Sequence, residues 1–234
     1  MSAPRLWAIV PAAGVGRRMG TEIPKQYLRL GGRTVLEHTL MVLAQIEGLA
    51  GVVVALSADD PYWPGLSLRL PCPLFTARGG VERADSVLNA LETLREHAGD
   101  QDWVLVHDAA RPCVRREDLA LLIGELRDDP IGGLLAVPVC DTLKQADGER
   151  RCAATVDRNG LWHALTPQMF RVGALRATLR DAHAAGVKVT DDAAAMELAG
   201  MRPRLIEGHA DNLKITRPED LALAEFHLRQ QGRL

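Results

Sequence analysis

The sequence has little cysteine, no long apolar run and almost no net charge. Its four cysteines, Cys72, Cys113, Cys140 and Cys152, include no CxxC pair, so we expect neither a disulfide framework nor a zinc site. Reduced thiols are typical of the cytoplasm, where we expect this protein to be. No run approaches the roughly 18 apolar residues of a membrane span. The sequence does not begin with a basic segment followed by a long apolar one, so we expect no secretory signal.

The balance of charge restricts the class of partner. The formal net charge is -2, and nonspecific nucleic-acid binding needs a basic face, so we expect no nucleic-acid partner. One local basic pocket remains compatible with this balance. The 234 residues are 47% apolar and 25% charged, which is typical of a globular protein. A chain of this length can bury roughly 70–75% of its unfolded surface, and we expect one domain over residues 1–234.

Short apolar runs alternate with stretches of helical periodicity along most of the chain. Buried strands are expected at 6–10, 51–56, 103–107 and 132–139. Helices are expected at 34–46, 83–97, 116–127, near 173–185, at 191–199 and at 217–230. The alternation predicts a Rossmann-like α/β fold, in which a mostly parallel sheet has helices on both faces.

The alternation stops at residues 138–165. Polar turns and a DG pair at 147–148 replace the helical period there, and this pattern indicates an extended β-hairpin. An extended hairpin needs something to pack against, and a second subunit is the expected cover. We therefore predict an arm at about 138–160 that forms a homodimer.

The stretch "IVPAAGVGRRMG" (9–20) predicts a strand followed by a Gly-rich turn, which is typical of phosphate binding. It fits neither common template, because the dinucleotide fingerprint fails at Met19 and no GK[ST] follows for a P-loop. What remains is a bare backbone over 12–16, followed by cations that include Arg18 and Lys25. These features suit a polyphosphate clamp, and the alternative is a surface turn with solvated arginines.

Another segment places polar side chains at the end of a predicted strand. In "VLVHDAARP", Asp108 follows a predicted central strand, where ligands of open α/β sheets bind. A carboxylate there could hold Mg²⁺, or it could be a turn or cap. His107 beside Ser86 could suggest a hydrolase triad, but the sequence has no GxSxG elbow.

Three other patterns leave alternatives open. In "GGVERADSV", the free N–H groups of a helix start could bind an anion or the polar edge of a base. Thr190 precedes Asp191 and Asp192 at another helix start, so any of the three could be a cap. Lys214 lies between apolar neighbours in an expected short strand, where a lysine is more often functional than on a helix surface, and the alternative is a position that faces solvent.

Together these segments resemble the sugar nucleotidyltransferases, and among them the 2-C-methyl-D-erythritol 4-phosphate cytidylyltransferases of the non-mevalonate isoprenoid pathway. The resemblance rests on "PAAGVGRRMG…PKQY", "ADSVLNAL", "VHDAARP", "DTLK", "TVDRNGLWHALTPQ", "TDDAAAME" and "DNLKITRPEDL", which follow the family's order and cover nearly the whole chain. It implies a Mg²⁺-dependent enzyme that transfers CMP from CTP to the sugar-alcohol phosphate and releases pyrophosphate.

The resemblance also implies roles for individual residues. Those at the reacting phosphates would be Arg18, Lys25 and Lys214. Those at the nucleotide would be Pro11, Ala12, Ala13, Gly14, Gly16, Gly80, Arg83, Ser86 and Ala109. Those at the acceptor would be Asp108, Arg111, Thr142, Arg158, Thr166, Thr190 and Lys214, with Asp108 as the metal ligand.

Two of the implied contacts leave an alternative open. The arm residues Thr142 and Arg158 would reach the acceptor bound in the neighbouring subunit, although Arg158 could instead form a salt bridge within the arm. Val81 stands where relatives often carry a polar or acidic residue, which leaves a side-chain contact to the base open.

The last expectations concern the mechanism of catalysis and the alternative functions. The acceptor phosphate is already an anion, so no general base is needed, and catalysis would consist of positioning and fixed positive charge. The alternatives are a cytidylyltransferase for another sugar-alcohol phosphate such as ribitol 5-phosphate, a nicotinamide-dependent oxidoreductase, and a regulatory nucleotide-binding protein without turnover. The mismatch at Met19 argues against the oxidoreductase.

Overall fold

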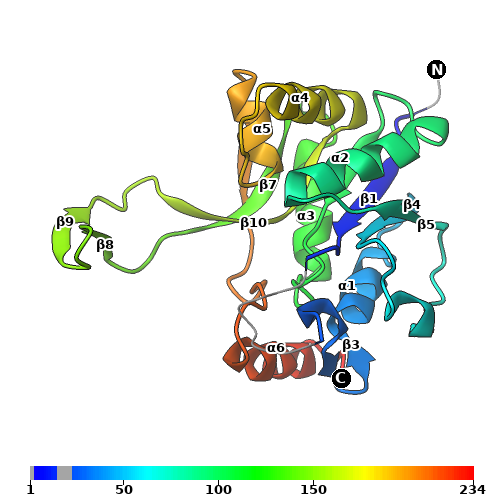
Figure 1. Ribbon diagram of the computed structural model, residues 1–234, viewed down its shortest axis with the longest axis horizontal. Helices are drawn as coiled ribbons and strands as arrows, with labels where there is room; N and C mark the ends of the chain where they lie inside the picture. Colours follow the sequence, from blue (N-terminus) through cyan, green and yellow to red (C-terminus); the bar gives the residue numbers. More distant parts are fainter. Residues whose placement is uncertain (1–2, 15–22) are drawn as a thin grey trace.

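The computed structural model describes residues 3–14 and 23–234. Among these residues, seven strands form a central sheet in the order β11-β7-β10-β6-β1-β4-β5 (Figure 1). The strands are β1 (Leu6–Pro11), β4 (Leu49–Leu56), β5 (Leu74–Arg78), β6 (Trp103–Val106), β7 (Gly132–Pro138), β10 (Trp162–Arg171) and β11 (Arg204–Glu207). Only β10 runs antiparallel to its neighbours, so the predicted mostly parallel α/β sheet is confirmed.

Helices form at all six predicted places. They are α1 (Val35–Leu43), α2 (Arg83–Thr93), α3 (Arg116–Leu126), α4 (Val172–Ala184), α5 (Asp192–Leu198) and α6 (Glu219–Gln230). The helix predicted over 83–97 is α-helical only to Thr93 and continues as a 3-10 turn, Leu94–Glu96. None of the helices in the described ranges is long and apolar enough to span a bilayer.

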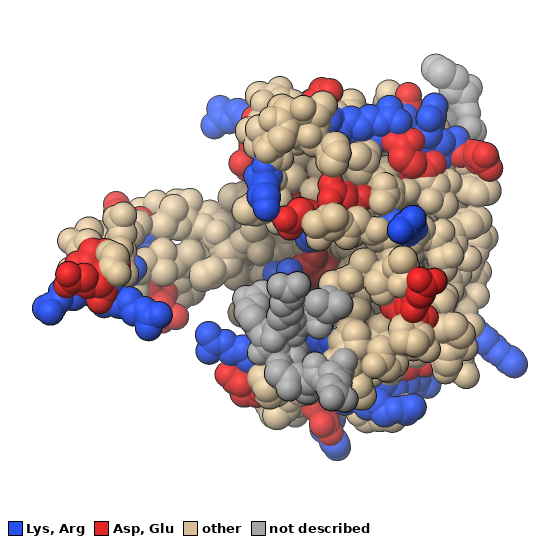
Figure 2. All heavy atoms as spheres, in the orientation of Figure 1, with Lys and Arg blue, Asp and Glu red and all other residues tan. Residues whose placement is uncertain are grey.

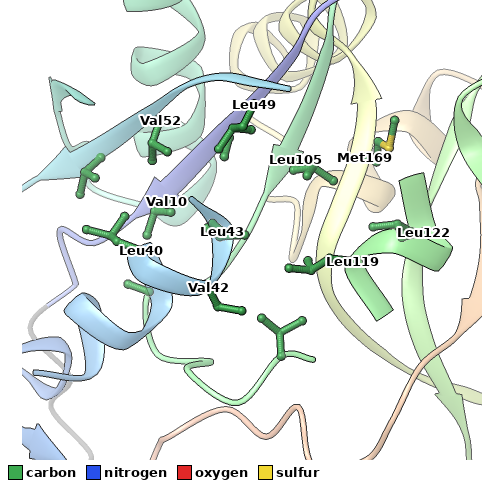
Figure 3. Packing of buried hydrophobic residues seen from close by; sticks show 14 of the residues in the cluster. Val10, Leu40, Val42, Leu43, Leu49, Val52, Leu105, Leu119, Leu122 and Met169 are labelled. Atoms are coloured by element: carbon green, nitrogen blue, oxygen red, sulfur yellow. The ribbon is translucent and has the colours of Figure 1, made fainter. Parts of the chain in front are cut away.

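Alternate residues of each central strand face opposite layers of helices. On β1, Ala8 and Val10 pack in the cluster that includes α1 and α3, whereas Trp7 and Ile9 pack in the cluster that includes α2, α4 and α5. Figure 3 shows the first cluster, where side chains of α1 and α3 lie against the sheet. Each fully buried aliphatic side chain contributes about 1.5–3 kcal/mol, so both faces hold the sheet rigid beneath its loops.

The sequence reasoning missed three strands of the central sheet, β5, β10 and β11. Of these, β10 matters most for the site. It pairs with β7 through 162–164 and 168–170, with an irregularity between Ala164 and Gln168, and with β6 through 168–171. Thr166 therefore lies where the ladder to β7 is interrupted, beside the end of β6.

The predicted hairpin is present. It consists of β8 (Leu143–Ala146) and β9 (Cys152–Val156), which pair antiparallel and stand well away from the body (Figures 1 and 2). Every residue of β9 is exposed. The arm therefore buries little of its own surface within the chain.

Candidate active site

A cleft lies at the carboxyl ends of the central strands, where ligands of α/β sheets bind. Four chain segments border it: those after β1, β5 and β6, and the one between β11 and α6. Its lining residues are Pro11, Ala12, Ala13, Gly14, Lys25, Gln26, Gly80, Val81, Glu82, Arg83, Ser86, Asp108, Ala109, Ala110 and Lys214. Figure 2 shows acidic and basic side chains close together in the hollow at the middle of the body.

The segment after β1 is held tightly at the cleft. The Ala12 N–H donates to the Ala55 carbonyl at 2.8 Å, and the Ala12 carbonyl accepts from Gln26 Nε2 at 2.6 Å. Gly79 lies so close that a Cβ on it would stand 2.2 Å from the Cβ of Ala13. The loops after β1 and β5 therefore meet at a position that admits only glycine. The sequence reasoning missed Gly79, although a GG pair after an apolar segment was a usable signal.

The loop after β5 is shaped by a buried serine. Ser86 is 3% exposed, and its Oγ accepts from the Gly80 N–H at 3.0 Å and donates to the Glu82 carbonyl at 3.3 Å. Val81 is 95% exposed between these residues. Gly80 and Ser86 therefore both line the cleft, and Val81 presents only an apolar side chain there. The predicted contacts of Gly80 and Ser86 with a nucleotide stay a prediction.

Asp108 is surrounded by three cations. Its Oδ1 accepts from Arg83 Nε at 2.9 Å, and its Oδ2 lies 2.8 Å from Lys214 Nζ and 3.5 Å from Arg111 Nε. Burial alone would raise the pKa of Asp108, but the charges of these three side chains hold it well below its usual range. The carboxylate is therefore ionised, and the cations around it outnumber it.

Arg83 bridges Asp108 to a second carboxylate that the sequence reasoning treated only as a possible cap. The Nη2 of Arg83 lies 2.9 Å from Oδ2 of Asp192, which is fully buried. Burial raises the pKa of Asp192, and the charge of Arg83 opposes that shift. The helix cap is Asp191, whose side chain accepts from the Ala194 N–H. The two adjacent aspartates therefore have different tasks.

A second cavity adjoins the first on the side of β10. Its lining residues are Arg83, Asp108, Arg111, Ala164, Leu165, Thr166, Gln168, Thr190, Asp191 and Lys214. Five of the predicted acceptor residues lie together here: Asp108, Arg111, Thr166, Thr190 and Lys214. Arg83, Asp108 and Lys214 line both cavities. The predicted nucleotide side and the predicted acceptor side thus share one charged wall.

Asn212 ties the parts of this wall together. Its carbonyl accepts from Arg111 Nη1 at 2.7 Å, and its Nδ2 donates to the Thr166 carbonyl at 2.7 Å. Lys214 follows in an irregular segment, so the short strand predicted around it is wrong. The segment is held instead by Asn212 and by the Ile215 N–H, which donates to the Ala110 carbonyl at 2.9 Å.

The second lysine of the cleft is Lys25. It begins the 3-10 turn Lys25–Tyr27, directly after Pro24, and its Nζ donates to the Ile215 carbonyl at 2.8 Å. The segment that carries Lys214 therefore also contacts Lys25. Two other predicted residues, Gly16 and Arg18, lie outside the described residues.

Thr142 and Arg158 are exposed on the arm and line neither of the chain's own two cavities. Arg158 donates to the Cys140 carbonyl at the base of the arm. Within the described ranges Arg158 has no carboxylate partner, so the salt bridge considered as an alternative is not formed there. Their predicted contact with a neighbouring subunit stays a prediction.

The donor set for a metal is small. The described residues contain no group of three or more His, Cys, Asp or Glu side chains that could hold an ion. Mg²⁺ commonly binds through one or two carboxylates together with substrate phosphates and water. Asp108 offers one such carboxylate, already paired with cations. These residues fit an ion that arrives with a polyphosphate, and they do not form a metal cage of their own.

Sequence comparisons with known proteins indicate one family. A protein of Pseudomonas fluorescens called 2-C-methyl-D-erythritol 4-phosphate cytidylyltransferase is 58% identical over 219 residues, which is 93% of each chain. The protein of the same name from Ectopseudomonas mendocina is 59% identical over the same length and share.

Solved structures agree as well. A crystal structure of 4-diphosphocytidyl-2C-methyl-D-erythritol synthase is 40% identical, with a TM-score of 0.84 over 96% of this chain and 99% of that one. The cytidylyltransferase of Francisella tularensis is 34% identical, with a TM-score of 0.83 over 96% and 100%. The family model described as 2-C-methyl-D-erythritol 4-phosphate cytidylyltransferase matches residues 6–230. The chain belongs to this family.

Proposed function

We propose that this chain transfers CMP from CTP to 2-C-methyl-D-erythritol 4-phosphate, giving 4-diphosphocytidyl-2-C-methyl-D-erythritol and pyrophosphate. The observation that carries the proposal is the charged wall of Arg83, Asp108 and Lys214, which two adjoining cavities share. A transfer between two anions needs two sites that meet at fixed positive charge. The family gives the identity of both substrates, so ribitol 5-phosphate is not the favoured acceptor.

The chemistry needs no base from the protein. An oxygen of the acceptor phosphate attacks the α-phosphorus of CTP in line, and the bond to the pyrophosphate oxygen breaks. His107 is the histidine next to Asp108, and burial lowers its pKa to about 4. Both of its ring nitrogens are already hydrogen-bonded within the protein. The chain's contribution is therefore positioning by the two cavities and positive charge from Lys25, Lys214 and Arg18.

We propose Mg²⁺ as the cofactor, held by Asp108 and the triphosphate of CTP. When bound, the ion would neutralise phosphate charge. The position of Asp108 supports this assignment, since Asp108 lines both cavities together with Lys214 on its Oδ2 and Arg83 on its Oδ1. Lys214 can exchange its carboxylate partner for a phosphate when CTP binds.

We also propose a homodimer in which the arm of each chain completes the partner's acceptor site. The support is the exposure of Thr142, Arg158 and all of β9, which leaves the arm without a covering surface in its own chain. The four cysteines are free thiols, and this supports a reducing compartment such as the cytoplasm.

The test is pyrophosphate release from CTP and Mg²⁺ with a panel of sugar-alcohol phosphates. We expect turnover with 2-C-methyl-D-erythritol 4-phosphate at least tenfold faster, in kcat/KM, than with ribitol 5-phosphate, a difference of about 1.4 kcal/mol. Equal turnover of the two acceptors would contradict the proposed substrate. Absence of pyrophosphate with every acceptor would contradict the proposed reaction.

A further inference from the structure

Thr166 lies where β10 loses its pairing with β7. The ladder to β7 covers 162–164 and 168–170, and the ladder to β6 covers 168–171, so Thr166 belongs to neither register. The residue is 4% exposed, and a buried carbonyl without a partner destabilises a fold. Its carbonyl therefore needs a donor from outside the sheet. Asn212 supplies that donor, because its Nδ2 lies 2.7 Å from the Thr166 carbonyl oxygen.

The orientation of the Asn212 amide follows from this contact. A carbonyl oxygen can only accept a hydrogen bond, so the amide atom that faces Thr166 is the nitrogen. The other amide atom, Oδ1, is buried and has no hydrogen-bond partner within residues 3–14 and 23–234. A buried acceptor without a partner lowers stability, so packing alone would favour a leucine of the same branched shape at this fully buried position. The amide therefore serves Thr166, not the core.

The backbone of Asn212 holds a second residue of the acceptor side. Its carbonyl oxygen accepts from Arg111 Nη1 at 2.7 Å. Arg111 and Thr166 both line the cavity beside β10, whereas Asn212 is not among the described residues that line either cavity. One buried residue thus sets the separation of two residues that border the same space.

The remaining contacts of this segment do not involve the Asn212 side chain. Lys214 Nζ reaches Asp108 Oδ2. The Ile215 carbonyl accepts from Lys25 Nζ, and the Ile215 N–H donates to the loop after β6. Loss of the amide at position 212 should therefore leave both lysines of the nucleotide-side cavity in place.

We propose that Asn212 is a positioning residue for the acceptor, which holds Thr166 through its side chain and Arg111 through its carbonyl without touching substrate. The proposal rests on the proposed function for the identity of that acceptor. A sugar-alcohol phosphate carries hydroxyl groups and a charged phosphate, so its recognition needs a polar group and a cation at a fixed separation. Asn212 keeps that separation, while the lysines of the nucleotide-side cavity are held by other contacts.

The first experiment compares Asn212→Leu with the matched control Asn89→Leu. Each substitution removes an amide that donates to a backbone carbonyl, and Asn89, which donates to the Arg78 carbonyl at 2.9 Å, is exposed on α2. In Asn212→Leu we expect kcat/KM for 2-C-methyl-D-erythritol 4-phosphate to fall by about 10- to 100-fold, mainly through KM, while the Kd for CTP stays within about twofold. Asn89→Leu should be near wild type in both measurements.

A merely structural role for Asn212 gives a different result. It would weaken CTP binding and acceptor use in parallel, because Lys214 lies on the same segment. That parallel loss, or an unchanged KM for the acceptor, would overturn the proposal. If Asn212→Leu does not fold, Asn212→Asp tests the same point, since it keeps the shape of the side chain and its ionised carboxylate cannot donate to Thr166. It should show the same separation of acceptor KM from CTP binding.

The second experiment needs no turnover. In NMR spectra of protein labelled with ¹³C at the threonine methyl groups, Thr166→Ser identifies the Thr166 signal by its loss. We expect this signal to shift or broaden in Asn212→Leu and to stay unchanged in Asn89→Leu, without any substrate present. An unchanged Thr166 signal in Asn212→Leu would overturn the proposal. Failure of the wild type to use the acceptor would refute the proposed function, and the NMR result would stand separately.

Discussion

Lys214 Nζ lies 2.8 Å from Asp108 Oδ2, although the two residues come from distant parts of the chain. The pair joins the segment before α6 to the end of β6, and it lies in the wall that the two cavities share. The lysine side chain is 37% exposed, so it can leave the carboxylate for a phosphate at little cost in desolvation. The site therefore holds its cations in place on protein oxygens before substrate arrives.

Lys25→Ala should reduce kcat by about 10²–10³-fold, because it removes one preorganised positive charge from the reacting phosphates. The Kd for CTP should change less, since a charge used in the transition state contributes less to ground-state binding. Steady-state kinetics and calorimetric CTP binding measure the two effects. Arg229→Ala, which removes an exposed ion pair with Glu225 on α6, is the matched control and should be near wild type. Near-wild-type kcat in Lys25→Ala would refute its role.

Asp108→Asn should lower turnover by at least about 10²-fold and raise the Mg²⁺ concentration needed for half-maximal rate. The amide is neutral, so it is a weaker ligand for a hard cation, and it leaves Arg83, Arg111 and Lys214 without their shared counter-charge. Pyrophosphate release across a Mg²⁺ titration measures both effects. A variant with the wild-type Mg²⁺ dependence would argue against Asp108 as the ligand.

Gly79→Ala should weaken CTP binding about tenfold and destabilise the fold by roughly 1–3 kcal/mol, because the new methyl would overlap the Cβ of Ala13. The two loops would have to move apart, and both line the nucleotide cleft. Calorimetry and thermal unfolding measure these changes. Gly148→Ala is the control, since no atom lies within 4 Å of a Cβ built there. Equal behaviour of the two variants would show that the close approach has no role.

Asp102→Asn should lose about 1–3 kcal/mol of stability at neutral pH. The carboxylate accepts from the Arg5 N–H at 2.9 Å, from Trp7 Nε1 at 3.1 Å and from the Gly99 N–H at 3.1 Å, and an amide cannot accept all three. Burial opposes the shift, but these hydrogen bonds lower the pKa of Asp102 below 3.8 in the folded state.

The lowered pKa of Asp102 determines how the stability of the protein changes with pH. A carboxyl with a depressed folded pKa stabilises the protein above its unfolded pKa, and this stabilisation is lost as the pH falls through the folded value. The difference in urea midpoint between wild type and Asp102→Asn should therefore be constant from pH 7 to 5 and narrow below about pH 3.8. A difference that widens on acidification would contradict the assignment.

Mixing two inactive variants tests the arm. If Arg158 serves the partner's site, then Lys25→Ala and Arg158→Ala each lack turnover alone, but a mixed dimer contains one site with both wild-type residues. Co-refolding the two variants should therefore restore a fraction of the activity, on the order of a quarter of the wild-type rate for statistical mixing of two-site dimers. No recovery, in a mixture shown to exchange subunits, would place Arg158 in the site of its own chain.

Local patterns were enough to predict most of the fold. The apolar runs at 6–10 and 103–107 and the periodic stretch at 116–127 identified β1, β6 and α3, because buried parallel strands and amphipathic helices have distinct apolar periods. Asp108 could be placed at the cleft for the same reason, since it directly follows a predicted strand.

The long-range partners could not be predicted this way. Asp192 looked like a helix cap, yet it forms an ion pair with Arg83, and Asn212 gave no signal although it holds Arg111 and Thr166. Such contacts depend on which strands and loops become neighbours in space, and a single side chain carries no periodicity that reports this.

The sequence by itself determined most of the alternation of strands and helices and the existence of the arm, because each of these is encoded in residues close together along the chain. Only the tertiary structure decided that β10 runs antiparallel beside β6 and thereby brings Thr166 to His107. It also decided that Lys214 reaches Asp108. Strand pairing and ion pairing between distant segments are set by packing of the whole core, and no local stretch of sequence contains that information.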